Sequence, residues 1–272
     1  MLMAAQDAGI SRFFYSSSAC VYNADKQRDA DVTALTEADA YPAMPEDGYG
    51  WEKLFSERMC RHFREDYGIK SRVARFHNVY GTYGTWEGGR EKAPAAICRK
   101  VMHAKHTGKH TIEIWGDGEQ TRSFMYISDC VKGVQTLTNS DFLEPINLGS
   151  SELVSINQLV TIAEEIAGIE LERSYKLDAP KGVRGRNSDN TLIKKVFGWE
   201  PDTRLADGMA KTYEWIEGEY LDKYGRGKTT GAAKPAKSSG KAKASRNGSA
   251  NASGNGKHKK AAGKSKAKPR AR

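Results

Sequence analysis

The sequence predicts an α/β fold with a mainly parallel sheet over residues 1–224. Short apolar strands alternate with amphipathic helices along this stretch, the pattern of strand–helix–strand units. A stretch of this length is long enough to bury a substantial single core. Local signals also mark helix ends, such as Ser155 before an apolar run and Gly168 after it.

The N-terminal part predicts one strand between two helices. Residues 1–9 are typical of the last turns of a helix that stops at Gly9. Residues 12–22 predict an apolar strand that runs into small polar residues, and the polar stretch 23–47 predicts a loop. A helix is expected over 48–67, with a ladder of apolar side chains as its buried face. The ladder consists of Trp51, Phe55, Met59, Phe63 and Tyr67.

The middle of the chain predicts two more strands and a helix. A strand is expected over 71–80, a glycine-rich loop over 81–89, a helix over 94–103 and a strand over 111–115. The loop lacks the compact G-x-G-x-x-G that opens a helix in dinucleotide-binding folds, and no other stretch of the sequence contains one.

The C-terminal part predicts mainly helices. Ser128 or Asp129 is expected to cap a helix whose apolar positions include Val131, Val134 and Leu137. The remaining elements are predicted, in order, as a strand over 146–148, a helix from Ser155 to Gly168, a basic turn over 181–186, and helices over 191–197 and 206–220.

The basic charge of the chain is concentrated in residues 225–272. This stretch holds 15 of the 43 Lys and Arg residues and none of the 34 Asp and Glu residues, so residues 1–224 carry 28 basic and 34 acidic groups, a net charge of −6. Its Lys, Ala, Gly and Ser composition cannot bury a core, which predicts a disordered tail. A solvated extension is the favoured interpretation, and a nucleic-acid-binding arm is the alternative.

Cysteine spacing and hydropathy predict a cytoplasmic protein. The four cysteines form no C-x-x-C pair, and no His cluster has metal-ligand spacing, so we expect no metal site and a reducing compartment. No apolar run approaches the roughly 18 residues of a membrane helix. Cys60, Cys98 and Cys130 fall on predicted helices and are expected to serve packing.

Tyr49 and Lys53 form a Tyr-x-x-x-Lys pair on the helix predicted over 48–67. A four-residue step brings the two side chains to one helix face, about 200° from Trp51 for Tyr49. The lysine charge favours a phenolate, which can take a proton from a sugar hydroxyl while a cofactor takes a hydride. Taken alone, the pair is more often a pair of ordinary neighbours on a solvated helix.

Several motifs occur together in a fixed order: Ser17-Ser-Ala-Cys20, Tyr49-x-x-x-Lys53, the stretch 75–81 and the stretch 116–124. Together they resemble the extended short-chain dehydrogenase/reductases that act on nucleotide sugars, the NAD-dependent epimerase/dehydratase family. The stretches 84–96 and 182–190, with Cys20, narrow this resemblance to the GDP-mannose 3,5-epimerases, over about residues 1–220.

The resemblance implies a partial Rossmann-like, doubly wound parallel sheet and a smaller C-terminal substrate domain. The domain would span 1–224, with substrate bound mainly by 80–110 and 145–224. It also implies an isomerase that converts GDP-mannose to GDP-L-galactose on the plant route to ascorbate, with bound NAD as cofactor and a homodimeric assembly. In this chemistry a transient ketone at C4 acidifies the C–H bonds at C3 and C5, where each centre is inverted.

The resemblance also assigns roles to individual residues. Tyr49 would take the C4 hydroxyl proton, with Lys53 supporting it and contacting the cofactor ribose. Cys20 and Lys92 would be the acid/base pair on either side of the sugar, and Ser18 would hydrogen-bond near the C4 oxygen. The substrate-binding set would be Ser18, Ala19, Cys20, Asn78, Glu91, Lys92, Ala93, Lys100, Gln120, Thr121, Arg122 and Arg186, the basic members reaching toward the diphosphate.

Simpler explanations exist for single residues. Cys20 beside a strand is often a small core residue, and Lys92 alone would be a solvated loop lysine. His77 sits in a strand and is expected to be a packed, hydrogen-bonded histidine. Arg184 fits the diphosphate as well as Arg186 does, although the motif favours Arg186.

Members of the family begin with a strand, a glycine-rich turn and a helix that bind the NAD pyrophosphate, and this sequence contains no such unit. We therefore expect an N-terminally truncated cofactor domain. Two interpretations stay open: the catalytic portion of an epimerase, or a non-catalytic fragment that cannot hold NAD and serves as an interaction module. Within the enzyme class, a 4-epimerase or dehydratase for another nucleotide sugar is the alternative.

Overall fold

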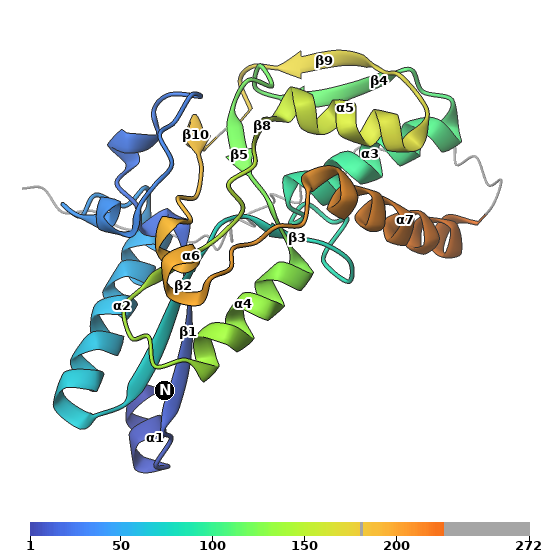
Figure 1. Ribbon diagram of the computed structural model, residues 1–272. Helices are drawn as coiled ribbons and strands as arrows, with labels where there is room; N and C mark the ends of the chain where they lie inside the picture. Colours follow the sequence, from blue (N-terminus) through green and yellow to red (C-terminus); the bar gives the residue numbers. More distant parts are fainter. Residues whose placement is uncertain (180–181, 226–272) are drawn as a thin grey trace, which may run out of the picture. The chain divides into compact units, whose positions relative to one another are not determined.

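The structure is a computed structural model that describes residues 1–179 and 182–225 (Figure 1). The chain divides into a compact unit, Met1–Thr229, and a second unit, Thr230–Arg272, that lies outside the described residues. The predicted tail therefore falls outside the description apart from Gly225, as does Lys181 of the predicted basic turn.

The α/β class is confirmed, with strands and helices in alternation. The helices are α1 (Leu2–Asp7), α2 (Gly48–Tyr67), α3 (Ala93–Thr107), α4 (Ile127–Asn139), α5 (Ile156–Ala167), α6 (Thr191–Phe197) and α7 (Leu205–Tyr224), with short 3-10 turns η1 (Ala19–Val21), η2 (Ala24–Gln27) and η3 (Glu37–Ala40). The strands are β1 (Arg12–Ser18), β2 (Lys70–Phe76), β3 (Val79–Tyr80), β4 (Thr111–Trp115), β5 (Thr121–Ser123), β6 (Met125–Tyr126), β7 (Ile146–Leu148), β8 (Leu153–Ser155), β9 (Glu172–Lys176) and β10 (Gly185–Arg186).

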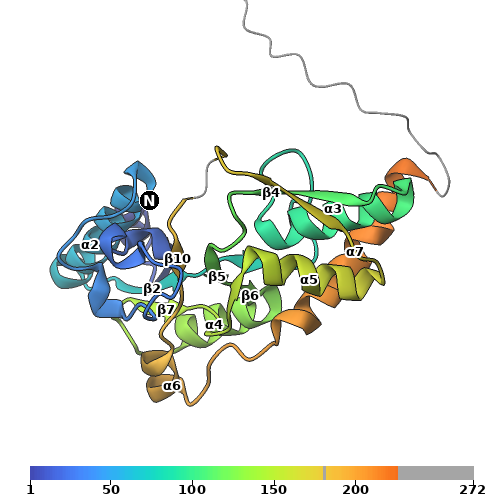
Figure 2. The same ribbon diagram turned by 90° about the horizontal axis from the view of Figure 1, so that it is seen from above.

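A parallel sheet with the order β1-β2-β7 forms one layer of the molecule. β1 and β2 pair along their full length, from Arg12 opposite Lys70 to Ser18 opposite Phe76. Helices α2 and α4 lie on opposite sides of this sheet in both views (Figures 1 and 2). The carboxyl ends of the parallel strands therefore meet at one edge, where α/β folds bind ligands.

A second group of elements surrounds the largest buried cluster. Helices α3, α5 and α7 pack against one another, and α3 also contacts β4, which pairs in parallel with β9 (Figure 1). The cluster includes Val101, Met102, Leu159 and Met209, all fully buried. A smaller mixed sheet, β10-β5-β8, brings together segments that are far apart in the sequence.

Several predicted bounds agree with the structure because local signals set them. The helices predicted over 48–67 and 191–197 and the strand over 111–115 have the observed bounds. Ser155 caps α5 as predicted: its Oγ accepts a hydrogen bond from the Gln158 backbone N at 3.1 Å, and Gln158 Oε1 accepts one from the Ser155 N at 2.8 Å. The helix then ends at Gly168, whose φ is 66°.

Two predicted elements need correction. The strand predicted over 71–80 breaks after Phe76, because Asn78 adopts a left-handed φ of 41° that an extended strand excludes. Helix α4 begins at Ile127, before either proposed cap, and Asp129 instead accepts a hydrogen bond from the Thr203 backbone N at 3.0 Å. Val131, one of the apolar positions named for this helix, is 47% exposed.

The predicted buried ladder of α2 is wrong. Trp51, Phe55 and Tyr67 are 47%, 66% and 51% exposed, whereas the buried positions of the helix are Gly50, Leu54, Glu57 and Cys60. A step of four residues advances about 400°, so each rung drifts about 40° around the helix and the ladder cannot stay on one face.

A buried ion pair, which the sequence reasoning missed, holds α2 on the sheet. Arg75 on β2 donates from Nη2 to Glu57 Oε2 at 2.7 Å and from Nε to Glu57 Oε1 at 3.0 Å, and both side chains are 3% exposed. Ser17 on β1 also donates a hydrogen bond to Glu57. Because of these partners, a charged residue, Glu57, occupies a buried position of α2, where the hydrophobic pattern alone predicts an apolar residue.

No helix among residues 1–179 and 182–225 combines the length and the apolar character needed to cross a membrane.

Candidate active site

Cys20 lies directly after the carboxyl end of β1. Ser18 ends the strand, and its Oγ accepts a hydrogen bond from the Cys20 backbone N at 3.2 Å, which turns the chain into η1. Cys20 is half-buried, whereas Cys60, Cys98 and Cys130 are buried, as their predicted packing role requires. Burial raises the pKa of Cys98 to about 12 and the pKa values of Cys60 and Cys130 to about 11, so these three stay thiols.

Helix α2 begins in contact with Cys20. Asp47 caps the helix by accepting a hydrogen bond from the Gly50 backbone N at 3.0 Å. A Cβ on Gly50 would lie 2.3 Å from the Cys20 carbonyl oxygen, a distance that real Cβ atoms do not reach. The glycine therefore permits a close approach that places Tyr49, its neighbour in sequence, beside the Cys20 turn.

Tyr49 and Lys53 share one face of α2, as their spacing predicts. Lys53 Nζ lies 5.4 Å from the centre of the Tyr49 ring and 5.1 Å from that of Tyr15. The amine also donates a hydrogen bond to the Ser16 carbonyl oxygen at 3.0 Å. Tyr49 is 49% exposed, so the residue is open to solvent.

Arg186 also contacts Cys20. Its Nη1 donates to Cys20 Sγ at 3.5 Å, its Nε to Gln27 Oε1 at 2.6 Å and its Nη2 to Glu46 Oε2 at 2.8 Å. The residue is 7% exposed. The sequence does not predict this contact, because Cys20 and Arg186 are 166 positions apart. The position of β10 in the fold brings the two residues together.

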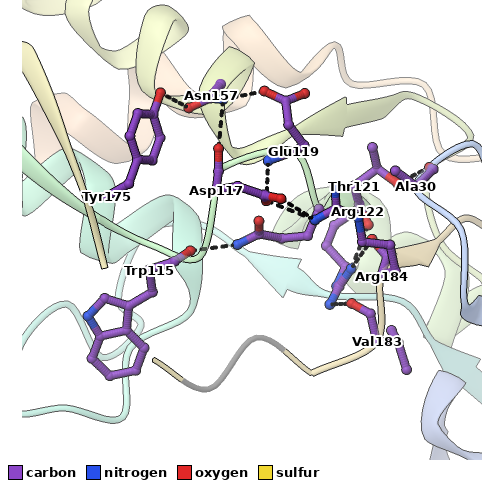
Figure 3. Close-up of polar contacts among 11 residues, drawn as sticks. Ala30, Trp115, Asp117, Glu119, Thr121, Arg122, Asn157, Tyr175, Val183 and Arg184 are labelled. Carbon is purple, nitrogen blue, oxygen red and sulfur yellow. Dashed lines mark hydrogen bonds and ion pairs between the residues drawn. The ribbon is translucent and has the colours of Figure 1, made fainter. Parts of the chain in front are cut away.

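Arg184 has a different partner. Its Nη1 donates to both carboxylate oxygens of Asp117, at 2.8 and 2.9 Å (Figure 3). The hydrogen bond from Arg184, together with one from the Glu119 backbone N, lowers the pKa of Asp117 to about 2. Of the two arginines that the sequence left as alternatives, only Arg186 contacts Cys20.

Arg122 and Thr121 on β5 hold the segment that carries Arg186. Arg122 donates from Nη2 to the Val183 carbonyl at 2.5 Å (Figure 3), and the Thr121 backbone N donates to the Arg184 carbonyl at 3.0 Å. The Thr121 hydroxyl donates to the Ala30 carbonyl of another loop (Figure 3). Burial, and after it the charge of Arg186, lowers the pKa of Arg122 to about 10. The two guanidinium groups therefore lie close enough to interact.

A cavity of about 630 Å³ collects other predicted substrate residues. Glu91, Ala93, Lys100 and Gln120 line it, together with Trp115. Gln120 donates from Nε2 to the Trp115 carbonyl at 2.8 Å, while its buried Oε1 has no hydrogen-bond partner among the described residues. Lys100 donates to the Glu113 carbonyl at 2.7 Å, and burial lowers its pKa.

Other predicted site residues have separate positions. Lys92 is exposed at the residue before α3, where its carbonyl accepts a hydrogen bond from the Ala96 backbone N at 3.0 Å. Within 1–179 and 182–225 its side chain makes no hydrogen bond or ion pair, with Cys20 or any other residue. Asn78 donates from Nδ2 to the Ser123 carbonyl at 3.0 Å, and Ala19 is buried. His77 is packed as predicted: it is fully buried, its Nε2 lies 3.0 Å from Asn147 Oδ1, and burial lowers its pKa to about 3.

Sequence reasoning missed Gln27, Glu46 and Gly50 as parts of this site. Glu46 stands beside the helix cap Asp47 and resembles any acidic residue of a first turn. Gly50 carries the one available signal, since a glycine inside a helical pattern points to a close backbone approach.

Comparisons with known proteins show which family the chain belongs to. The model of the NAD dependent epimerase/dehydratase family matches residues 1–149. GDP-mannose 3,5-epimerase 1 of rice (Oryza sativa subsp. indica) is 53% identical over 223 residues, which cover 82% of this chain and 57% of the relative. GDP-mannose 3,5-epimerase of Arabidopsis thaliana is 48% identical over 246 residues, covering 86% of this chain and 63% of the relative.

Among solved structures, UDP-glucose 4-epimerase of Thermotoga maritima, crystallised with UDP-glucose, superposes with a TM-score of 0.71 at 27% identity. The superposition covers 80% of this chain and 67% of that chain. The chain thus spans less than two thirds of the length of the curated plant relatives above, 57% and 63%. The family match and the identity to these relatives show that the chain belongs to the NAD dependent epimerase/dehydratase family.

Proposed function

We propose that the chain catalyses the epimerisation of GDP-mannose at C3 and C5 to GDP-L-galactose. The observation that carries the proposal is the contact of Gly50 with the Cys20 carbonyl, which brings a thiol and a tyrosine–lysine pair to one edge of the sheet. A tyrosine–lysine pair alone suits oxidation at one carbon. A thiol next to it adds a second acid/base group, which inversion at a neighbouring carbon requires.

NAD is the cofactor that the family implies, and the residues present fit its nicotinamide-ribose end. The Tyr49 side chain is accessible, and the Lys53 amine is fixed beside it by the Ser16 carbonyl. Tyr49 and Lys53 would therefore contact that end of the cofactor. Bound NAD would supply reversible hydride transfer at C4 of the sugar, and the transient ketone would make the C–H bonds at C3 and C5 acidic.

Tyr49 takes and returns the proton of the C4 hydroxyl in this proposal. The ammonium of Lys53 lies 5.4 Å from the centre of the Tyr49 ring, so its positive charge is close to the phenol that gains negative charge as the proton moves. Ser18, whose hydroxyl lies at the end of β1, orients the C4 oxygen.

Cys20 and Lys92 move protons at C3 and C5. Cys20 is half-buried at the edge of the sheet, and Lys92 adjoins the 630 Å³ cavity through its lining neighbours Glu91 and Ala93. A thiol and an amine on opposite sides of the ring can remove a proton on one face and supply one on the other.

The GDP moiety is assigned to the cavity and its rim. Lys100 and Gln120 line the cavity, and Arg122 lies one residue further along β5. The unpartnered Oε1 of Gln120 supports a polar ligand, since buried acceptors in folded proteins are normally hydrogen-bonded. Asn78, Glu91, Ala93 and Thr121 complete the proposed substrate contacts.

A homodimer is the proposed assembly. The exposed apolar side chains of α2, Trp51 and Phe55, form the surface proposed for contact with a second copy, because large exposed apolar groups on one helix mark interaction sites. A cytoplasmic location is proposed with it.

Two measurements on the 272-residue chain test the proposed function. NAD titration followed by fluorescence asks whether the chain holds the cofactor, and NMR of the nucleotide sugar asks what it makes. We expect NAD binding and formation of GDP-L-galactose from GDP-mannose. No binding at millimolar NAD would show a non-catalytic fragment, and turnover of UDP-glucose but not GDP-mannose would favour a 4-epimerase.

A further inference from the structure

A glycine-rich loop forms part of the wall of the cavity of about 630 Å³. Glu87, Gly88, Gly89 and Glu91 of this loop line the cavity, together with residues of α3 and β4. Gly88 and Gly89 have φ angles of 95° and 85°, which favour glycine, so the chain turns sharply between the two acidic residues. The loop therefore contributes two carboxylates to the cavity.

The lining of this cavity carries more negative than positive charge. Three acidic residues, Glu87, Glu91 and Glu113, stand against two basic ones, Arg99 and Lys100, which gives a net charge of −1. Arg99 compensates one of the acids, since its Nη2 donates to Glu91 Oε1 at 2.8 Å. The lining alone would thus repel an anionic ligand such as a nucleoside diphosphate.

The compensating positive charge comes from the last turn of α7. Lys223 Nζ forms an ion pair with Glu87 Oε1, and the Tyr224 hydroxyl donates to Glu87 Oε2 at 2.9 Å. Both carboxylate oxygens therefore have a donor. Burial raises the pKa of Glu87, but the hydrogen bonds from Lys223 and Tyr224 outweigh burial and lower this pKa overall. The carboxylate is therefore ionised at neutral pH and needs a cation.

Contacts with α3 hold this end of α7 in place. The His103 Nδ1 of α3 lies 3.2 Å from the Tyr220 hydroxyl, and the His106 ring stacks on the Tyr220 ring with 5.5 Å between their centres. One helical turn further on, the Tyr224 ring lies 4.9 Å from that of Tyr220. The two helices run side by side (Figure 1). Lys223 is thereby fixed at the level of the loop.

We propose that Lys223 allows the cavity to bind an anionic nucleotide by neutralising Glu87, with Tyr224 as the second group that holds the carboxylate. The inference rests on the assignment of GDP to this cavity in the proposed function. Among the described residues, Lys223 lies outside the lining of the cavity, so its charge reaches the ligand site through Glu87. It is a positioning residue, and the ion pair brings the net charge of the lining with this partner to zero.

A double-mutant cycle on the full chain tests the inference, with the affinity for GDP by calorimetry as the readout. The cycle consists of Lys223→Gln, Glu87→Gln and the combination of both. Lys223→Arg is the conservative variant, because it keeps the charge. Lys194→Gln is the matched control: Lys194 forms an ion pair with Glu200 at 2.8 Å, its side chain is 67% exposed, and neither residue belongs to the described lining of the cavity.

We expect Lys223→Gln to weaken GDP binding by about threefold to fivefold, the scale of a partly exposed ion pair, because Glu87 then has no cation. Glu87→Gln removes the same negative charge and should leave the affinity within about twofold of wild type. Adding Lys223→Gln to Glu87→Gln should then change nothing further. Lys223→Arg and Lys194→Gln should bind GDP as wild type does.

Equal weakening by Lys223→Gln with and without Glu87→Gln would overturn the inference, because Lys223 would then act on the nucleotide directly or through the fold. Unchanged GDP affinity in Lys223→Gln would overturn it as well. The Lys223 side chain is 51% exposed, so its replacement leaves the core intact. The outcome is separable from the proposed function: the cycle can hold in a chain that binds GDP without turning over GDP-mannose, and it can fail in one that makes GDP-L-galactose.

Discussion

Two arginines of one short segment illustrate how position decides the role of a side chain. Arg184 and Arg186 are two residues apart, yet one pairs with Asp117 near the surface and the other is buried against Cys20. The sequence could not separate them, because both match a basic turn and their partners lie 67 and more than 100 residues away. Long-range pairing of this kind becomes visible only in three dimensions.

His77 makes the stability of the chain depend on pH. Its pKa is lowered to about 3 by burial, so the folded state resists protonation that the unfolded state accepts below its ordinary value of about 6.5. This contribution is complete above about pH 6.5 and is lost as the pH falls toward 3, with a slope of up to about 1.4 kcal/mol per pH unit.

Urea unfolding of wild type and His77→Gln at pH 7.5 and pH 5.5 checks this prediction. The free energy of unfolding should fall less on acidification in the variant than in wild type. His110→Gln is the matched control, since His110 is exposed, and it should follow wild type. Equal losses in all three proteins would contradict the assignment to His77.

At the scale of elements, the sequence predicted the ends of several helices well and the pairing of strands poorly. The ends of α2, α5 and α6 follow from caps and apolar spacing within a few residues. Strand β9 was missed because its residues, Glu-Arg-Ser-Tyr-Lys, show no apolar alternation, and most of them are exposed in the structure. Its pairing with β4 defines it as a strand. The motifs around Cys20, Tyr49 and Lys53 were found in sequence, but the residues that hold them, such as Gln27 and Glu46, were not.

The first turn of α2 contains two glycines with different surroundings, which gives an element-scale prediction. A Cβ on Gly50 meets the Cys20 carbonyl oxygen at 2.3 Å, whereas a Cβ on Gly48 meets nothing within 4 Å. Gly50→Ala should lower the free energy of unfolding by about 1–3 kcal/mol, because backbone atoms must move apart. Gly48→Ala should raise it by about 0.5 kcal/mol through reduced chain entropy.

Chemical denaturation of the two variants provides the comparison. The Gly50→Ala protein should also lose turnover of GDP-mannose, since the shift separates Tyr49 from the Cys20 turn. Similar stabilities for the two alanine variants would mean that the close approach of α2 to η1 is not important.

At the scale of the whole molecule, the exposed apolar side chains of α2 predict association of two copies. Phe55 is 66% exposed, so its replacement does not disturb the core of the monomer. Phe55→Glu should convert a dimer to a monomer in analytical ultracentrifugation, because two like charges would meet across the contact. Lys195→Glu, an exposed change on α6, should leave the dimer intact; a wild-type monomer at all concentrations would contradict the proposed assembly.

The central claim is that the Cys20 turn and the Tyr49–Lys53 helix form one epimerase site. Its most direct test is the incubation of GDP-mannose with the chain and NAD in D2O, followed by NMR of deuterium at C3 and C5 of the recovered sugar. Wild type should incorporate deuterium at both carbons. Cys20→Ser should reduce incorporation by about a hundredfold or more, the usual scale for loss of an acid/base group, and Tyr49→Phe should abolish it while GDP-mannose still binds. Deuterium exchange that is unchanged in Cys20→Ser, or absent in wild type with NAD bound, would contradict the account.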